Sequence, residues 1–146
     1  MKIIIAGSRT FTDTDAFVQA FKKLYDLPKF PIITEFIVGG ANGADTIGEN
    51  FAKLTNTLYT KFLPNWDKYG SPRAAHKRNW QMANAGNILV AFWDGKSKGT
   101  EHMLNCMSKY PNKPVYIFYF EPNIRKDLHT KSTHFFIMNQ PKETKQ

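Results

Sequence analysis

The chain of 146 residues is long enough for one folded domain, and a composition of 42% hydrophobic and 22% charged residues excludes bulk disorder. Cys106 is the single cysteine, which excludes intrachain disulfides and cysteine-based zinc sites. Short apolar runs and the lack of a signal-peptide pattern predict a cytoplasmic protein without membrane partners. The net charge of +8 favours a polyanionic partner, either free nucleotides or nucleic acid, and a basic surface that serves only solubility is the alternative.

Short apolar runs alternate along the chain with helical patterns, which predicts an α/β fold with a mostly parallel sheet of about five strands. The predicted strands are residues 2–6, 32–38, 57–62, 87–93 and 114–120, with residues 134–138 as a candidate edge strand. The run at 87–93 is the most apolar and is expected at the centre of the sheet, because strands buried on both faces lose their alternation.

Helical periodicity is found between the predicted strands. The apolar face of the first helix comprises Phe17, Phe21, Leu24 and Tyr25, and Thr12, Asp13 or Thr14 can cap it. The apolar face of the second helix comprises Ala44, Ile47, Gly48, Phe51 and Leu54. Residues 73–85 and 100–109 are two further predicted helices, and residues 64–72 are predicted to form a loop.

The character of the chain changes after Glu121. Residues 1–121 are predicted to form the domain. Residues 122–146 form a basic extension with five lysines and arginines against two acids, and its last eight residues are predicted to be frayed.

Three motifs follow predicted strands, where open α/β sheets bind ligands. The first is Ala6-Gly7-Ser8-Arg9-Thr10, directly after the first strand. Its glycine permits close backbone approach, its hydroxyls can donate hydrogen bonds, and Arg9 offers a planar cation suited to phosphate or carboxylate. The alternative is an ordinary tight turn with a solvated arginine.

The second motif spans residues 39–45, and its candidate binding residues are Gly39, Gly40, Ala41, Gly43 and Asp45. Glycines let backbone N–H groups converge on an anion at a helix N-terminus, or they serve only the turn. The motif is neither a GxGxxG fingerprint nor a Walker P-loop. Asp45 would repel a neighbouring phosphate, so it is expected either to receive a ribose hydroxyl or to cap the helix.

The third motif follows the central strand and contains Asp94, Gly95, Ser97, Gly99 and Thr100. Its amides and hydroxyls can hold a second phosphate ahead of another helix. Lys96 and Lys98 of the same loop are expected to be solvated.

Between the motifs, Trp66 or Tyr69 can stack a base, or pack against the domain, and Arg78 and Asn79 can reach the pocket. His76 has no metal-ligand spacing. The sequence contains no recognisable nucleophile–histidine set or carboxylate pair. The catalytic residues therefore stay unknown, with Asp45, Asp94 and Glu101 as the acids inside or beside the motifs. The residues predict a nucleotide pocket more strongly than a reaction.

In their order and spacing, these motifs resemble the SLOG superfamily of SMF/DprA-type and LOG-type proteins, and most closely its small YspA-like branch of bacteria and phages. The matching features extend over residues 2 to about 118 and are Gly7-Ser8-Arg9-Thr10-Phe11, Asp13, Gly39-Gly40-Ala41, Gly43-Ala44-Asp45, Trp66, Arg78-Asn79, Met82, Phe92-Trp93-Asp94-Gly95, Ser97, Gly99-Thr100 and His102. The resemblance implies a Rossmann-like three-layer domain with a pocket for a nucleotide or a nucleotide-derived ligand.

The resemblance also bears on catalysis. LOG-type enzymes cleave the N-glycosidic bond of nucleoside 5′-monophosphates with an arginine and the glutamate of a PGGxGTxxE signature. Here Met103 occupies the glutamate position and Trp93-Asp94-Gly95 replaces Pro-Gly-Gly. Glu101 could substitute only if the helix were rotated, and Asp45 or Asp94 is the alternative candidate to stabilise an oxocarbenium-like state.

Three functions follow from these observations. The first is a sensor or sequestering protein for an ADP-ribose, NAD-type or nucleoside monophosphate ligand. The second is a hydrolase or transferase acting on an N-glycosidic or phosphoribosyl bond, and the third is a DprA-like binder of single-stranded nucleic acid. No residue pattern requires a cofactor. Mg²⁺ arriving with a phosphate ligand and a homodimer of the LOG kind are left open.

Overall fold

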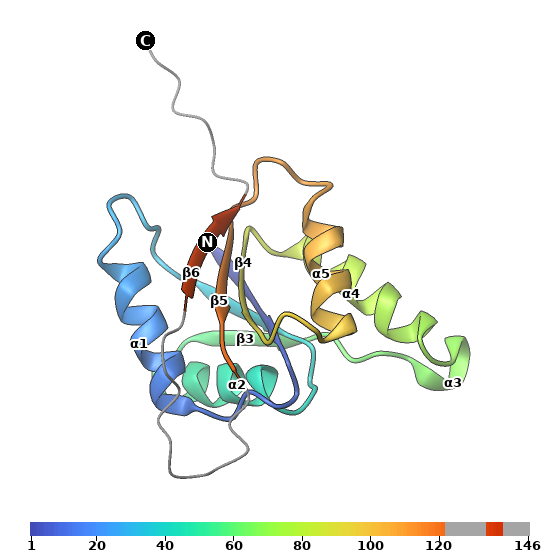
Figure 1. Cartoon of the computed structure of the whole chain (residues 1–146). Coiled ribbons are helices and arrows are strands. Elements are labelled where there is room, and N and C mark those ends of the chain that lie inside the picture. Colours follow the sequence, from blue (N-terminus) through green and yellow to red (C-terminus); the bar gives the residue numbers. More distant parts are fainter. Residues whose placement is uncertain (122–133, 139–146) are drawn as a thin grey trace.

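The computed structural model describes residues 1–121 and the backbone of residues 134–138. It contains one six-stranded sheet in the order β3-β2-β1-β4-β5-β6, parallel except for the antiparallel β6 (Figure 1). The strands are β1 (Lys2–Gly7), β2 (Glu35–Val38), β3 (Leu58–Lys61), β4 (Ile88–Trp93), β5 (Val115–Tyr119) and β6 (His134–Met138). The predicted α/β class, the mostly parallel sheet and the added edge strand are confirmed, as is the central place of β4.

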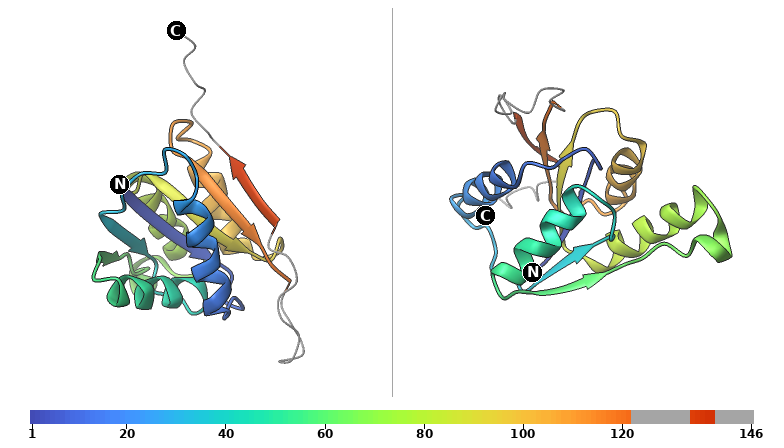
Figure 2. Two further views of the ribbon diagram at one scale, coloured as in Figure 1. Left: turned by 90° about the vertical axis from the view of Figure 1, so that its left-hand side faces the viewer. Right: turned by 90° about the horizontal axis from the view of Figure 1, so that it is seen from below.

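Helices cover both faces of the sheet and make a three-layer, Rossmann-like arrangement (Figure 2). The helices are α1 (Thr14–Tyr25), α2 (Ala44–Leu54), α3 (Trp66–Tyr69), α4 (Arg73–Ala85) and α5 (Lys98–Met107). Helices α1 and α2 pack on one face and α4 and α5 on the other, so the side chains of β1 alternate between two buried clusters.

The helix α1 shows why the sequence folds this way locally. The Asp13 carboxylate accepts a hydrogen bond from the Ala16 amide at 2.9 Å and caps the helix, which selects one of the three predicted cap residues. Phe17, Phe21 and Leu24 are buried, as predicted. Tyr25 is 54% exposed, because one residue beyond Leu24 turns the helix by about 100°.

The prediction that Leu54 lies on the buried face of its helix is also wrong. Leu54, predicted on the buried face of α2, is 85% exposed. It lies two residues beyond buried Ala52, a rotation of about 200° that takes it to the opposite side of the helix.

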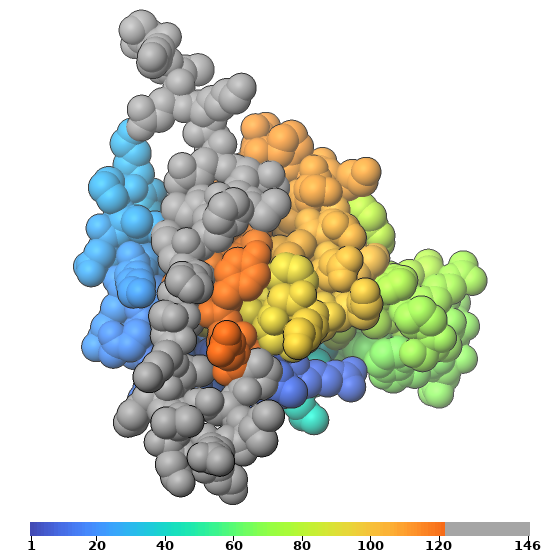
Figure 3. Space-filling model, in the orientation of Figure 1, coloured from blue at the N-terminus to red at the C-terminus, as the bar shows by residue number. Residues whose placement is uncertain are grey.

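Several predicted boundaries also shift. The second strand begins at Glu35 rather than at 32, the loop at 64–72 contains the short helix α3, and α5 begins at Lys98 rather than at Thr100. The space-filling view in Figure 3 shows that the green residues of α3 and of the start of α4 project from one side of the molecule.

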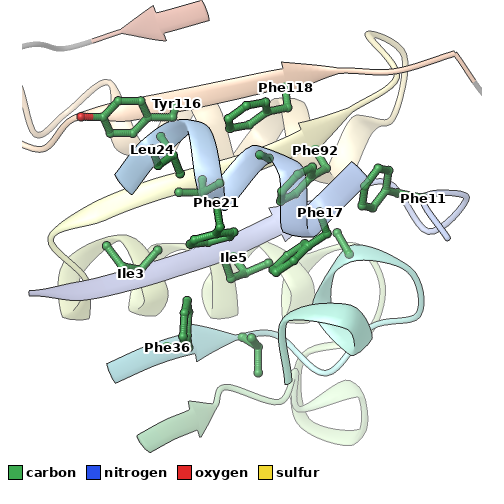
Figure 4. Close-up of a cluster of buried hydrophobic side chains, with 14 of the residues drawn as sticks. Ile3, Ile5, Phe11, Phe17, Phe21, Leu24, Phe36, Phe92, Tyr116 and Phe118 are labelled. Carbon is green, nitrogen blue, oxygen red and sulfur yellow. The ribbon is translucent and has the colours of Figure 1, made fainter. Parts of the chain in front are cut away.

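The face covered by α1 and α2 carries a continuous aromatic core (Figure 4). The ring of Phe17 lies 4.9 Å from that of Phe21 and 4.9 Å from that of Phe92, and Phe11 stacks on Phe92 at 4.7 Å. These side chains are at most 1% exposed, so this face is densely packed.

No helix among the described residues has the length and apolar character needed to cross a membrane. Residues 122–133 and 139–146, which include most of the predicted basic extension and its predicted frayed end, lie outside the described residues.

Candidate functional site

A cavity of about 400 Å³ lies beyond the carboxyl ends of β1 and β4. After β1 the chain adds β2 and β3 on one side of β1, and it then returns to add β4 and β5 on the other side. The cavity therefore lies at the point where the strand order reverses. It is lined by Ala6, Gly7, Ser8, Arg9, Thr10, Ala41, Asp45, Pro72, Ala75, His76, Arg78, Asn79, Met82, Ser97, Lys98, Gly99, Thr100 and Met103.

Of the residues predicted to bind a ligand, the cavity brings together Gly7, Ser8, Arg9, Thr10, Ala41, Asp45, Arg78, Asn79, Ser97, Gly99 and Thr100. The predicted residues that do not line it are Gly39, Gly40, Gly43, Trp66, Asp94 and Gly95. Trp66 lies on α3 and is 46% exposed. Of the three candidate catalytic acids only Asp45 lines the cavity.

A hydrogen-bond network joins the loop after β1 to the loop after β4. Ser8 is 1% exposed; its amide donates to the Phe92 carbonyl at 2.9 Å, and its hydroxyl accepts from the Asp94 amide at 3.2 Å. The hydroxyls of Ser8 and Ser97 are 2.7 Å apart. The two loops therefore form one unit at the base of the cavity.

Asp94 organises its own loop. Its carboxylate accepts hydrogen bonds from the amides of Lys96 and Ser97 at 2.9 and 2.8 Å and from the Ser97 hydroxyl at 2.8 Å. Burial acts to raise the pKa of Asp94, but these hydrogen bonds outweigh it and hold the pKa below its ordinary value. The group is thus an ionised loop anchor that lies outside the lining of the cavity.

Asp45 is 7% exposed and belongs to the first turn of α2. Its carboxylate accepts from the Ala41 amide at 3.2 Å, while Gly43 is the N-cap and no side chain caps the helix. The interpretation of Asp45 as a helix cap is therefore wrong. Burial raises the pKa of Asp45 to about 6, against the lowering effects of the Ala41 amide and of the Arg78 charge.

Two arginines line the cavity, and they differ in burial and in hydrogen bonding. Arg78 is partly buried; its guanidinium donates to the Gly39 carbonyl and, at 3.1 Å, to Asn79 Oδ1. Burial lowers the pKa of Arg78, although the Asp45 charge opposes the shift. Arg9 is exposed and forms no hydrogen bond or ion pair with any described residue. Arg9 is therefore a cation of the lining that is available to a ligand.

Close packing explains two of the predicted glycines. A side chain at Gly7 would collide with the Phe92 carbonyl and lie 2.7 Å from Ala44 Cβ. Gly43 has φ +83°, and a side chain there would meet the backbone oxygens of Ser8 and Arg9. These glycines bring strand ends and a helix together, whereas Gly99 faces open space.

The N-terminus of α5 borders the cavity through Ser97, Lys98, Gly99 and Thr100. The Ser97 side chain makes no cap hydrogen bond to the helix, since its hydroxyl is held by Asp94 and Ser8. The first amides of α5 lack intrahelical acceptors, and with the helix dipole they favour an anion. The Lys98 ammonium, 91% exposed, pairs with Glu101 at 3.7 Å.

Sequence reasoning missed one wall of the cavity. Pro72, Ala75, His76, Asn79 and Met82 follow one face of α4 at spacings of three and four residues, the signal that could have found them. Only Asn79 was predicted to bind, with Met82 among the residues of the resemblance. Ala6 belongs to the first motif but was not among its predicted binding residues, Lys98 was expected to be solvated, and Met103 was not predicted to line a pocket.

The wall between α4 and α5 carries a histidine stack. The rings of His76 and His102 are 3.9 Å apart and nearly parallel, and Asn79 Nδ2 donates to His102 Nδ1 at 3.0 Å.

Burial raises the pKa of Cys106 to about 11, so this thiol stays protonated at neutral pH. Within the described residues, no three His, Cys, Asp or Glu side chains are grouped as a metal site.

The fold and the cavity define a Rossmann-like α/β protein with a small-molecule-sized site at the switch point of its sheet. The sequence model of the YAcAr family, described as the YspA, cpYpsA-related SLOG family, matches residues 1–69. This match confirms the predicted resemblance to the SLOG superfamily and to its YspA-like branch. No curated protein and no solved structure shows significant similarity to the chain.

Proposed function

We propose that the protein binds a nucleotide or a nucleotide-derived ligand in this cavity, with a phosphate held between Arg9 and the N-terminus of α5. The observation that carries the proposal is the convergence on one cavity, at the switch point of the sheet, of open helix amides and of Arg9, which pairs with no other described residue. The SLOG match of residues 1–69 supports the same class of ligand.

The size and chemistry of the cavity agree with this ligand. Its volume of about 400 Å³ lies within the roughly 300–1,000 Å³ of small-molecule sites. Arg9 and the helix amides favour an anion near α5, and Met82 and Met103 add an apolar wall. Asp45 lines the same cavity and is a hydrogen-bond acceptor for a sugar hydroxyl.

Binding affinity tests the proposal directly. Calorimetric titration with AMP, ADP-ribose, NAD, adenosine and inorganic phosphate separates the phosphate from the nucleoside contribution. Arg9→Ala is expected to weaken binding of the phosphorylated ligands by about tenfold or more, since it removes a charge-assisted contact. The same substitution should leave the affinity for adenosine unchanged, because adenosine carries no phosphate.

A matched control removes a neighbouring cation that does not line the cavity. Lys96→Ala lowers the net charge by the same amount as Arg9→Ala and lies in the loop after β4. Equal losses in the two variants would assign the effect to overall charge and contradict the proposed site.

One observation favours an N-glycosidic hydrolase or transferase as the second candidate. Asp45 is the one candidate acid that lines the cavity, and its pKa of about 6 suits proton transfer near neutral pH. Chromatography of a nucleotide incubated with the protein would detect a released base. Release that is lost in Asp45→Asn supports the hydrolase, and an intact ligand supports the sensor or sequestering protein.

A further inference from the structure

A second surface of the molecule combines cations and aromatic rings away from the cavity lining. It lies on α3 and on the exposed side of α4, which project together from the sheet (Figures 1 and 3). We define it as the arm surface, formed by Trp66, Lys68, Tyr69, Arg73, Lys77 and Trp80. None of these residues lines the cavity.

Three cations gather around one ring of this surface. Lys77 Nζ lies 4.3 Å from the centre of the Tyr69 ring, Lys68 Nζ lies 5.1 Å from it, and Arg73 Cζ lies 5.7 Å from it. Among the described residues, none of the three pairs with an acid. Tyr69 therefore holds together positive charges that no described carboxylate neutralises.

Two exposed tryptophans flank these cations. Trp66 is 46% exposed and lies one turn before Tyr69 on α3, and Trp80 is 41% exposed. Arg73, Lys77 and Trp80 follow one another at spacings of four and three residues, which places them along one side of α4. The surface thus places positive charges beside flat apolar rings.

The balance of charge in this segment is positive. Residues 64–81 contain one acid, Asp67, against Lys68, Arg73, Lys77 and Arg78, and the last of these is directed to the Gly39 carbonyl. A negatively charged partner is favoured, and exposed rings beside the cations favour one whose bases are accessible for stacking.

We propose that the arm surface binds single-stranded nucleic acid, with phosphates on Lys68, Arg73 and Lys77 and bases stacked on Trp66 and Trp80. The cations that Tyr69 holds supply sequence-independent phosphate contacts. The tryptophan rings supply stacking surfaces for unpaired bases. The bases of a duplex are already stacked inside the helix and cannot reach these rings. This function is separate from nucleotide binding in the cavity.

Fluorescence anisotropy of a labelled oligothymidylate of about 20 nucleotides, longer than a single-domain site, tests the proposal with the full chain. Lys68→Glu/Lys77→Glu is expected to weaken binding by roughly tenfold or more and to reduce the slope of log K against log salt by about 1.4. The neutral pair Lys68→Gln/Lys77→Gln should show the same direction with a smaller loss. Trp66→Ala is expected to weaken binding about tenfold.

Matched controls lie on the opposite face of the sheet. Lys22→Glu/Lys23→Glu on α1 changes the net charge by the same amount, and Tyr25→Ala removes an aromatic side chain that is 54% exposed. Both controls should leave the affinity for the oligonucleotide within about twofold, since a surface away from the contact contributes little. Melting temperatures verify that every variant is folded.

Three results would overturn the proposal: no binding of the oligonucleotide, equal losses in the arm and α1 charge pairs, or duplex DNA that binds as tightly as the single strand. The arm variants should keep the nucleotide affinity of the cavity, because none of their residues lines it. Failure of the arm surface and failure of the cavity are therefore measured separately.

Discussion

The two faces of the sheet are covered by different types of buried side chain. Under α1 and α2 the buried cluster is rich in phenylalanine, with rings in contact from Phe11 to Phe118. Under α4 and α5 the fully buried side chains are aliphatic residues, methionines and Cys106, and the cavity opens at this cluster. Both faces share the strands between them.

The difference separates stability from binding. Large rings that interdigitate leave little free volume, whereas the face with α4 and α5 leaves a cavity bordered by Met82 and Met103. We infer that apolar truncations on the aromatic face cost more free energy of unfolding than those at the cavity, and that substitutions at the cavity also change ligand affinity.

The largest expected effect is the loss of a central ring. Phe17 is fully buried and contacts three other rings, so Phe17→Ala should lower the free energy of unfolding by about 3–5 kcal/mol. Met82→Ala, at the cavity wall, should cost about 2 kcal/mol, because its side chain already borders empty space. Urea denaturation measures both, and an equal cost would contradict the comparison.

The next effect depends on pH. Since the pKa of Asp45 is raised from 3.8 to about 6, folding disfavours its charged form. The stability that the protonated form gives is present below pH 3.8 and is lost as the pH rises through 6. Asp45→Asn should therefore raise the free energy of unfolding by roughly 2–3 kcal/mol at pH 8 and by much less at pH 4. A gain that does not depend on pH would refute this account.

Two glycines should respond with opposite signs. Gly43→Ala places a side chain at positive φ against the backbone of Ser8 and Arg9, and should destabilise the protein by about 1–3 kcal/mol or more. Gly99→Ala meets open space in the first turn of α5, and should stabilise it by up to about 1 kcal/mol. Because Gly99 lines the cavity, the same change should weaken nucleotide binding. Melting curves and calorimetry give the two signs.

The smallest effect concerns the histidine stack. Burial, followed by the neighbouring charge of His76, lowers the pKa of His102, so the folded protein disfavours protonated His102. His102 therefore lowers the free energy of unfolding as the pH falls below about 6.5, the ordinary pKa of histidine. The sign is opposite to that of Asp45. His102→Asn should flatten the melting temperature between pH 7 and pH 5, and an unchanged slope would exclude His102 as its source.

Periodicity predicted most of the fold, because each strand and helix buries a side that the sequence marks with apolar residues. Helix α4 has the predicted bounds, and the edge strand at 134–138 is found. The predictions failed where one residue of helix rotation decides burial, as at Tyr25 and Leu54. The helix α3 has four residues and no buried side chain, so it leaves no periodic signal.

The candidate site was predicted where residues directly follow a strand, since topology alone brings strand ends together. Contacts between distant segments were beyond sequence reasoning. The hydrogen bond from the Asp94 amide to the Ser8 hydroxyl joins residues 86 positions apart, while the Asp94 carboxylate accepts hydrogen bonds within its own loop. The same limit applies to Met103 and to the stacking of His76 on His102.

The pairing of β1 with β4 joins segments that leave the ribosome at different times. Lys2 donates to Asn87 across 85 positions, and Ile3 pairs with Ile88. A chain that has left the ribosome only as far as α3 carries β1, β2 and β3, while the other edge of β1 still lacks its neighbour. Residues 1–69, which the family model matches, therefore lack the strand that pairs with the other edge of β1. Until β4 emerges, we expect the nascent chain to expose that edge, which favours pairing with strands of other chains.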